Sequence, residues 1–313
     1  MDILSILVTV IGLCLFETIS SIDNAIINAE VLTTMSQKFR KIFLTWGLFI
    51  GVFVVRFTLP WLIVWTATPS LGPFEALLAT FSSDPQVAKA IEDSAPFLLI
   101  GGGTFLIFLF FNWLFLEPKN YGLIGERFIY KQGVWFFAVA SILLAIIVYF
   151  AIRIDAIMGF SVVLGSTAFF IVHGFRTNAE HKEKELMGSN LPDLSKFFYL
   201  EIIDSTFSID GVLGAFAFTL SVPLILLGNG IGAIIVRQIT VGNISRIKKY
   251  IFLKNGAMYS ILFLGSFMIL ESFGIDLPSW FSPLITFMIV GYFFLKSRNA
   301  IKNNNTKNDS NGK

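Results

Sequence analysis

The chain has 313 residues, of which 55% are hydrophobic, 15% aromatic and only 14% charged, and its net charge is +2. A soluble globule of this composition would expose too much apolar surface, so the composition excludes that class. Together with a mean hydropathy of +0.76, it indicates an all-α protein that crosses a lipid bilayer several times. The single cysteine, Cys14, excludes a disulfide framework and a cysteine-based metal site, and we expect no nucleic-acid partner.

About nine apolar segments have the length of about 20 residues that crosses some 30 Å of hydrocarbon. In chain order they cover residues 3–34, 42–66, 97–116, 134–152, 156–175, 197–220, 222–243, 250–270 and 278–295. The first is long, so its last turns are expected to project beyond the bilayer. No cleavable signal stands out, because the first apolar run continues directly into a polar string.

Two polar strings interrupt the first and the sixth segments at matching places. They are Glu17-Thr18-Ile19-Ser20-Ser21-Ile22-Asp23-Asn24 and Asp204-Ser205-Thr206-Phe207-Ser208-Ile209-Asp210-Gly211. Each begins with an acid and reaches Ser-Ile-Asp four residues later. An ionised group near the bilayer centre costs at least ~2.5–3.5 kcal/mol, so two matched acidic strings indicate a functional site.

A second pair of matches widens the repeat. Residues 50–56 and 231–237 each carry Ile-Gly and then Arg, Arg56 or Arg237, one apolar segment after an acidic string. The chain therefore divides into a first repeat (1–116), linking segments with a charged loop (117–196), a second repeat (197–270), a peripheral helix (271–302) and a tail (303–313) whose composition predicts disorder.

The distribution of Lys and Arg predicts the orientation. Placing the N-terminus outside and the C-terminus inside puts eighteen of them in the cytoplasm, Arg176 among them, against only Lys89 and Arg153 outside. We therefore expect a multi-pass protein of the plasma membrane. In this topology the two acidic strings run antiparallel, so the repeat is inverted. Inverted halves with polar interruptions are typical of a transporter whose site lies near the midplane.

The candidate site offers only oxygen ligands, which suit manganese, magnesium or calcium rather than zinc or copper. The five acids exceed the two arginines by three formal negative charges, so a transported cation, not a resident cofactor, is the missing partner. The expected metal ligands are Glu17, Asp23, Asn24, Glu201, Asp204 and Asp210, supported by Ser21, Ser208 and Asn28, with Arg56 and Arg237 balancing charge.

Helical geometry leaves one point open. At ~100° per residue, Asp23 lies ~120° away from the face that Glu17 shares with Ser21 and Asn24. Either the helix unwinds at Ser20 and Ser21, or Asp23 pairs elsewhere in the bundle. Asp210 is offset in the same way from the stripe formed by Glu201, Asp204, Ser205 and Ser208.

Several residues have simpler interpretations. Any one of the acids could hydrogen-bond a neighbouring serine or pair with an arginine to lock helices together. His173 and His181 are eight residues apart, and we expect them in a solvated loop rather than in a metal pair. Lys254 is expected to extend its amine to the membrane surface.

The two acidic motifs, from Phe16-Glu17 to Asn24-Ala25 and from Glu201-Ile202-Ile203-Asp204 to Ser208-Ile209-Asp210, together with the two Gly-x4-Arg segments, resemble the TerC family of membrane proteins. This family lies within the LysE-type transporter superfamily, and the chain is similar to a long branch of it. The resemblance implies export of metal ions, above all manganese, an ion site at the acidic motifs and a link to tellurite resistance. Gly211 stands where the first motif has Asn24, so the second motif offers one amide fewer.

Three classes of function were weighed. An intramembrane aspartyl protease would carry Gly-x-Gly-Asp and Tyr-Asp signatures, which both strings lack, so we expect no enzyme. A cation exporter must work against an inside-negative potential worth ~2.3 kcal/mol per charge per 100 mV, which calls for exchange, with protons as the expected counter-ion. An accessory factor that supplies metal to secreted enzymes, or scaffolds a stress-response complex, would share the same site.

Lipid and metal ion are the expected partners, and a homo-oligomer is compatible with the sequence.

Overall fold

The structure, a computed structural model, describes residues 3–47, 50, 58, 61–62, 65–66, 72–74, 76, 85–187, 192–242, 247–275, 277–278 and 280–311. Within these residues every regular element is helical. The elements are α1 Ile3–Ser20, α2 Ile22–Thr33, α3 Gln37–Ile42, the π-helix η1 Phe43–Gly47, α6 Pro85–Leu116, α7 Glu126–Tyr130, the 3-10 helix η3 Gly133–Trp135, α8 Phe136–Ala151, α9 Ala156–Met187, α10 Asp193–Ala215, α11 Val222–Gly242, α13 Leu253–Ser272 and α14 Phe281–Asn311.

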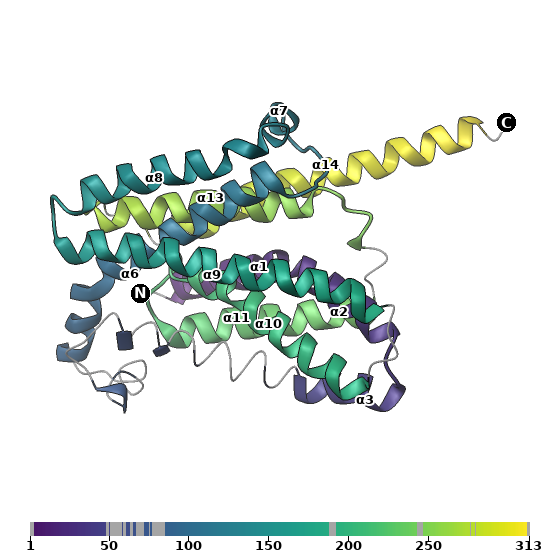
Figure 1. The fold of residues 1–313 in the computed structure, drawn as a ribbon, viewed down its shortest axis with the longest axis horizontal. Coiled ribbons are helices and arrows are strands. Elements are labelled where there is room, and N and C mark those ends of the chain that lie inside the picture. The colour runs from purple at the N-terminus through teal and green to yellow at the C-terminus, as the bar shows by residue number, and fades with distance from the viewer. Residues whose placement is uncertain are drawn as a thin grey trace.

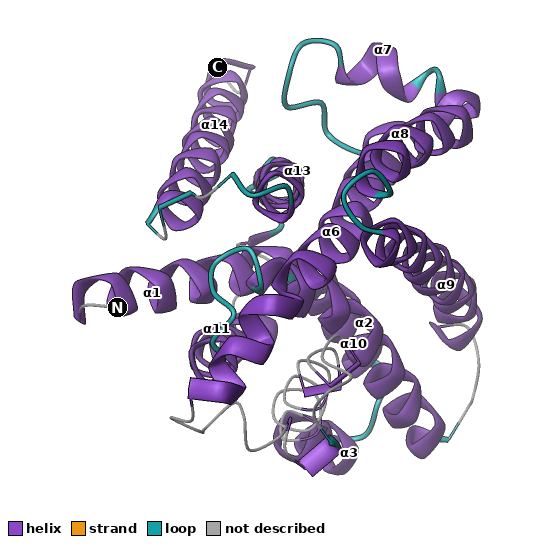
Figure 2. Ribbon diagram, turned by 90° about the vertical axis from the view of Figure 1, so that its left-hand side faces the viewer, coloured by secondary structure: helices purple, strands orange, loops and turns teal. Residues whose placement is uncertain are grey.

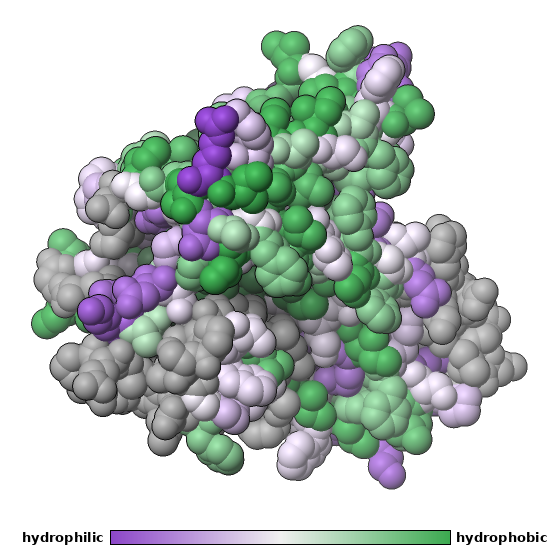
Figure 3. All heavy atoms as spheres, turned by 60° about the vertical axis from the view of Figure 1, so that its left-hand side comes forward, coloured by the Kyte–Doolittle hydropathy of each residue, from purple (hydrophilic) through white to green (hydrophobic). Residues whose placement is uncertain are grey.

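Seven of the described helices are long and apolar enough to cross a bilayer, which confirms an all-α polytopic membrane protein. The stretches are residues 3–20, 92–116, 133–151, 156–178, 222–239, 253–272 and 281–303. Hydrophobic side chains cover much of the face seen in Figure 3, as expected of a surface that meets lipid. Most of the predicted second segment, 42–66, lies outside the described residues, together with Arg56.

The helix α10 is not among these seven, although its 23 residues span about 35 Å at 1.5 Å per residue. Its apolar part carries Glu201, Asp204 and Asp210, which lower its hydropathy. The same acids that make α10 a candidate for the functional site therefore remove it from a count based on composition.

The helix α6 lies at the centre of the bundle, with α13 against one side and α9 against the other (Figures 1 and 2). Close helix contacts depend on the glycines that precede Thr104. A β-carbon at Gly103 would lie 2.8 Å from the Gly265 carbonyl oxygen, and one at Gly101 would lie 2.9 Å from that of Ser161. Small residues let membrane helices approach this closely, so these glycines serve packing.

The remaining helices surround this centre. The helix α1 packs against α11, α14 packs against α13 and α1, and α8 packs against α9. Figure 1 shows α14 projecting beyond the other helices toward the C-terminus. Its backbone stays helical through Asn311, into the segment for which composition predicts disorder. A helix satisfies its own backbone hydrogen bonds, so it can continue past the apolar stretch that anchors it.

The fifth predicted segment also continues beyond its expected end. The helix α9 runs to Met187 instead of ending near residue 175, so Arg176 and His173 are helical residues and do not belong to a loop. The end near residue 175 was predicted from the change from apolar to charged residues. Charged residues such as Lys and Glu are good helix formers, so the helix continues where the apolar stretch ends.

Candidate functional site

The first acidic string lies across a break between two helices. The helix α1 ends at Ser20 and α2 begins at Ile22, while Ser21 between them has φ −88° and ψ 4°. Hydrogen bonds continue on both sides, because the Ser21 N–H donates to the Glu17 carbonyl at 3.1 Å and the Ala25 N–H to the Ser21 carbonyl at 2.9 Å. The break is thus a local distortion at Ser21, the position of one of the two alternatives that helical geometry leaves open.

The side chains at this break are tied together. The Ser21 hydroxyl donates to Glu17 Oε1 at 2.8 Å, and Glu17 is fully buried. The backbone of Asp23 belongs to α2, but its side chain lies outside the described part of the structure. The supporting role predicted for Ser21 is therefore the orientation of Glu17.

The two acidic strings lie side by side and run in opposite directions. Residue numbers rise along α1 and α2 while those of the facing residues fall along α10. The facing pairs are Phe16 and Gly214, Glu17 and Gly211, Asn24 and Asp204, Thr34 and Lys196, and Ser36 and Asp193. The antiparallel relation expected of the two strings is thus visible along their whole length.

Two of these contacts are reciprocal. Glu17, the first residue of one string, faces Gly211, the eighth residue of the other. Asp204, the first residue of the second string, accepts a hydrogen bond from Nδ2 of Asn24, the eighth residue of the first, at 2.5 Å. Equivalent positions of the two strings are therefore in contact at both ends of the paired region.

The reciprocal contacts differ in their chemistry. A β-carbon at Gly211 would overlap Glu17 Oε2, so glycine leaves the room that the longer acid needs. At the other contact the acid is the shorter Asp204, and the Asn24 amide reaches across to it. The residue change at position eight is therefore matched by a change of acid length at position one.

Asn229 of α11 supplies an amide where Gly211 has none. Its side chain is 1% exposed, and Nδ2 donates to the Gly211 carbonyl at 3.4 Å. Gly232, one turn further along α11, lies against the same acid, since a β-carbon there would lie 2.7 Å from Glu17 Cβ. Asn229 was not among the predicted site residues; its only signal in the sequence is an asparagine between two glycines in an apolar run.

Glu201 lies one turn before Asp204 on α10 and is 8% exposed. Neither of its carboxylate oxygens has a hydrogen-bond partner among the described residues. Arg237 has Asp204 and Glu201 as its charged neighbours, but its guanidinium donates to the Phe43 carbonyl and lies 4.9 Å from the Phe43 ring centre. Arg237 therefore lies near both acids without forming a described ion pair with either.

Asp210 pairs with an arginine other than the predicted Arg56 and Arg237. Arg176 of α9 forms an ion pair with Asp210, and the two side chains are 11% and 10% exposed. The other charged neighbours of Asp210 are Glu117 and Glu17. Arg176, which the positive-inside count predicts on the cytoplasmic side, thus lies against the second acidic string, and its pairing with Asp210 was not predicted.

The buried oxygens around the strings include several that lack a donor among the described residues. They belong to Glu201, Asp210, Asn24, Asn28 and Asn229. Ser208 is not one of them, since its hydroxyl donates to the Asp204 carbonyl at 2.6 Å. Buried acceptors without donors lose their hydration with no compensation unless water or a cation supplies it. The oxygens of this region therefore have the chemistry of cation ligands.

The described acids nevertheless form two groups, one near each end of the paired region of α10 and the α1–α2 helices. Glu201 and Asp204 lie near Asn24 and Arg237, whereas Glu17 and Asp210 lie near Gly211 and Arg176. Within the described side chains, which exclude Asp23, no three carboxylates, imidazoles or thiols gather as a metal-binding group. The convergence of four acids on one point is thus not present among the described side chains.

Two further residues differ from their expected roles. Lys254 donates to Glu117 Oε2 at 2.5 Å, and both side chains are about one third exposed, so this lysine joins α13 to the end of α6 instead of only reaching the surface. His173 stacks on Phe169 with the ring centres 5.7 Å apart, inside α9. The side chain of His181 lies outside the described residues.

Comparisons with known proteins give one result. No curated protein and no solved structure matches the chain significantly. One family model matches residues 22–306, which is most of the chain and includes both acidic strings except for the first five residues of the first. The chain therefore belongs to the family described as protein of unknown function DUF475.

Proposed function

We propose that the protein exports a divalent cation, with manganese as the expected ion, through a site between the two acidic strings. The observation that carries this proposal is the set of buried carboxylate and amide oxygens that lack donors where α10 faces α1, α2 and α11. Hard divalent cations take such oxygens as ligands, and a cation would offset the burial of these groups. The resemblance of both motifs to the TerC family supports the choice of manganese.

Alternating access by inverted halves is the proposed mechanism. It is supported by the antiparallel course of the strings and by the reciprocal contacts of Glu17 with Gly211 and of Asn24 with Asp204. A site on a pseudo-twofold axis can open to either side when one half moves against the other. In the proposed topology the N-terminus faces outward, the C-terminus faces the cytoplasm, and inward flow of protons drives export across the plasma membrane.

Transport by the purified full-length protein in liposomes tests this proposal. We expect manganese flux that depends on a proton gradient, and its loss in Asp204→Asn, which removes the charge but keeps the shape. Asp193→Asn is the matched control, because Asp193 lies at the start of the same helix and contacts the Ser36 N–H instead of the site. Flux in the control and none in Asp204→Asn is the expected pattern; equal flux in both would exclude the site.

The second candidate is an accessory factor that handles metal without transporting it. The same buried oxygens favour it, since binding alone requires them. Manganese binding by the purified protein without flux in liposomes would establish this alternative. Absence of both binding and flux would reject the exporter and the accessory factor together.

A further inference from the structure

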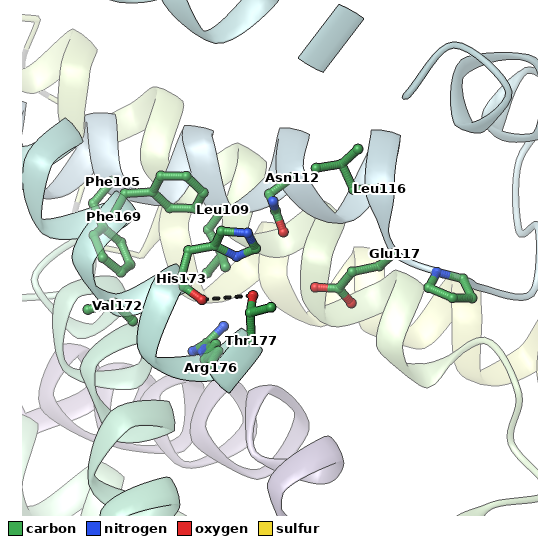
Figure 4. A pocket seen from close by; sticks show the side chains of 11 residues that line it. Phe105, Leu109, Asn112, Leu116, Glu117, Phe169, Val172, His173, Arg176 and Thr177 are labelled. Carbon is green, nitrogen blue, oxygen red and sulfur yellow. Dashed lines mark hydrogen bonds between the residues drawn. The ribbon is translucent and has the colours of Figure 1, made fainter. Parts of the chain in front are cut away.

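A cavity of about 240 Å³ lies between α6 and α9, beside the second acidic string. Figure 4 shows His173 of α9 and Asn112 of α6 pointing into it from opposite sides, with Glu117 at the end of α6. Asn112 is 2% exposed, and its Nδ2 has no hydrogen-bond partner among the described residues. A polar cavity of this size holds several water molecules.

Arg176 connects this cavity to the candidate cation site. It lines the cavity and also pairs with Asp210, whose side chain is 10% exposed. The guanidinium therefore occupies one face of a carboxylate that the proposed function requires as a cation ligand. A bound divalent ion and the guanidinium would compete for this carboxylate, because each neutralises the same charge.

A second carboxylate borders the same cavity. Glu117 interacts electrostatically with Arg176 and with Asp210. Burial alone would raise the pKa of Glu117, but Lys254, with further help from Arg176 and Lys119, holds that pKa below its ordinary value. Glu117 is thus an anion that can receive a guanidinium, and the long arginine side chain has two carboxylates among its charged neighbours, Asp210 and Glu117.

We propose that Arg176 is a tethered cation at Asp210, that the transported ion displaces it, and that the displaced guanidinium moves into the cavity toward Glu117. This inference rests on the proposed function. It adds the residue that sets the affinity of the site for the cation and that ensures release of the cation. When Arg176 returns to Asp210, it expels the ion. Arg176 acts through Asp210 and does not ligate the metal, so it is a positioning residue.

The proposal predicts opposite effects for the two partners of Arg176. If the arginine occupies Asp210 in about nine of ten molecules, Arg176→Gln tightens Mn²⁺ binding about tenfold, because the competent fraction no longer limits the apparent affinity. Glu117→Gln weakens binding, because it removes the acceptor of the displaced side chain. In the Arg176→Gln background, Glu117→Gln has no further effect.

Coupling between Arg176→Gln and Glu117→Gln distinguishes an arginine that moves between two acids from an arginine that stays in one place. Two fixed charges would change the affinity independently, so their effects would add, whereas a shared mobile partner makes them non-additive. Transport gives a second readout. Arg176→Gln should lower the Mn²⁺ concentration for half-maximal flux and also lower the maximal flux, since release becomes slow, while Arg176→Lys should be intermediate.

The experiment is calorimetric titration of purified full-length protein with Mn²⁺ for wild type, Arg176→Gln, Arg176→Lys, Glu117→Gln and the double variant. Lys248→Gln is the matched control, because it removes a positive charge from an ion pair with Glu30. The side chains of Lys248 and Glu30 are 43% and 41% exposed. Size-exclusion profiles and thermal unfolding check that each variant is folded.

Tighter binding in Arg176→Gln with non-additive coupling to Glu117→Gln supports the proposal, as does binding that arises only in Arg176→Gln. Unchanged or additive affinities, with Mn²⁺ still bound by wild type, would overturn the tethered cation and leave the proposed function standing. Absence of Mn²⁺ binding in wild type and Arg176→Gln alike would overturn both.

Discussion

Two buried carboxylates of this protein, Glu126 and Glu201, have opposite environments. Glu126 is 2% exposed and accepts hydrogen bonds from the backbone N–H groups of Gly122 and Leu123, at 2.6 and 3.0 Å, and from the side chains of Asn255 and Tyr259. Glu201 is 8% exposed and has no donor among the described residues. Burial of an acid is therefore not by itself a sign of a binding site.

The difference indicates which acid is structural. The donors around Glu126 fix the segment after α6 against α13, and a buried charge with four donors is already compensated. Glu201 lacks this compensation, and a buried acceptor in that state calls for an ion or water. The distinction predicts opposite responses to substitution, which the following changes test in order of expected size.

Glu126→Leu should give the largest loss of stability. It leaves two backbone N–H groups, an amide and a phenol without their shared acceptor, and losing one partner of a buried charged network typically costs about 3–5 kcal/mol. Thermal unfolding of the purified protein measures this. An unfolding temperature equal to that of wild type would contradict the structural role of Glu126.

Glu201→Gln should leave stability within about 1 kcal/mol of wild type, because no described hydrogen bond is lost. What it should remove is stabilisation by the cation, which for wild type amounts to about 2.7 kcal/mol at a hundredfold excess of Mn²⁺ over the dissociation constant. Unfolding with and without Mn²⁺ measures both quantities. Undiminished stabilisation by Mn²⁺ would show that Glu201 is not a ligand of the ion.

Gly211→Ala should have a smaller effect, and mainly on the cation. The added methyl group displaces the Glu17 carboxylate, while the better helix propensity of alanine offsets about 1 kcal/mol of any loss in stability. We expect weaker Mn²⁺ binding, with recovery when Glu17→Asp is added. Gly230→Ala is the control, because no atom lies within 4 Å of a β-carbon there. Equal Mn²⁺ affinities in the two alanine variants would refute the size match between positions 17 and 211.

The smallest expected effect concerns Lys119, near Glu126. Burial lowers the pKa of Lys119 to about 8, although Glu117 and Glu126 act in the opposite direction. In Glu126→Gln the favourable charge is lost, so this pKa should fall below about 8. The pH dependence of amine acylation at Lys119, read by mass spectrometry, measures the shift. A rise of the pKa would mean that Glu126 does not act on this lysine.

Parts of the candidate site were predictable because they lie in local, repeated sequence. The matched strings predicted antiparallel helices, and helical geometry gave a distortion at Ser20 and Ser21 as one of two alternatives; the antiparallel course and a distortion at Ser21 are both present. The pairing of Arg176 with Asp210 was not predicted, because hydropathy marks where apolar residues end, not where a helix ends. Asn229 was missed because nothing local distinguishes an asparagine that faces Gly211 from one that faces a neighbouring helix.

The sequence by itself determined the membrane class, most helix positions and the two acidic strings, since these follow from apolar length and from a motif that occurs twice. Only the tertiary structure decided which acid has donors and which has none among the described residues. Hydrogen bonds to Glu126, the pairing of Asp210 with Arg176 and the isolation of Glu201 all depend on residues from other helices. Those partners are set by how helices pack in three dimensions, and packing joins positions that the linear sequence keeps far apart.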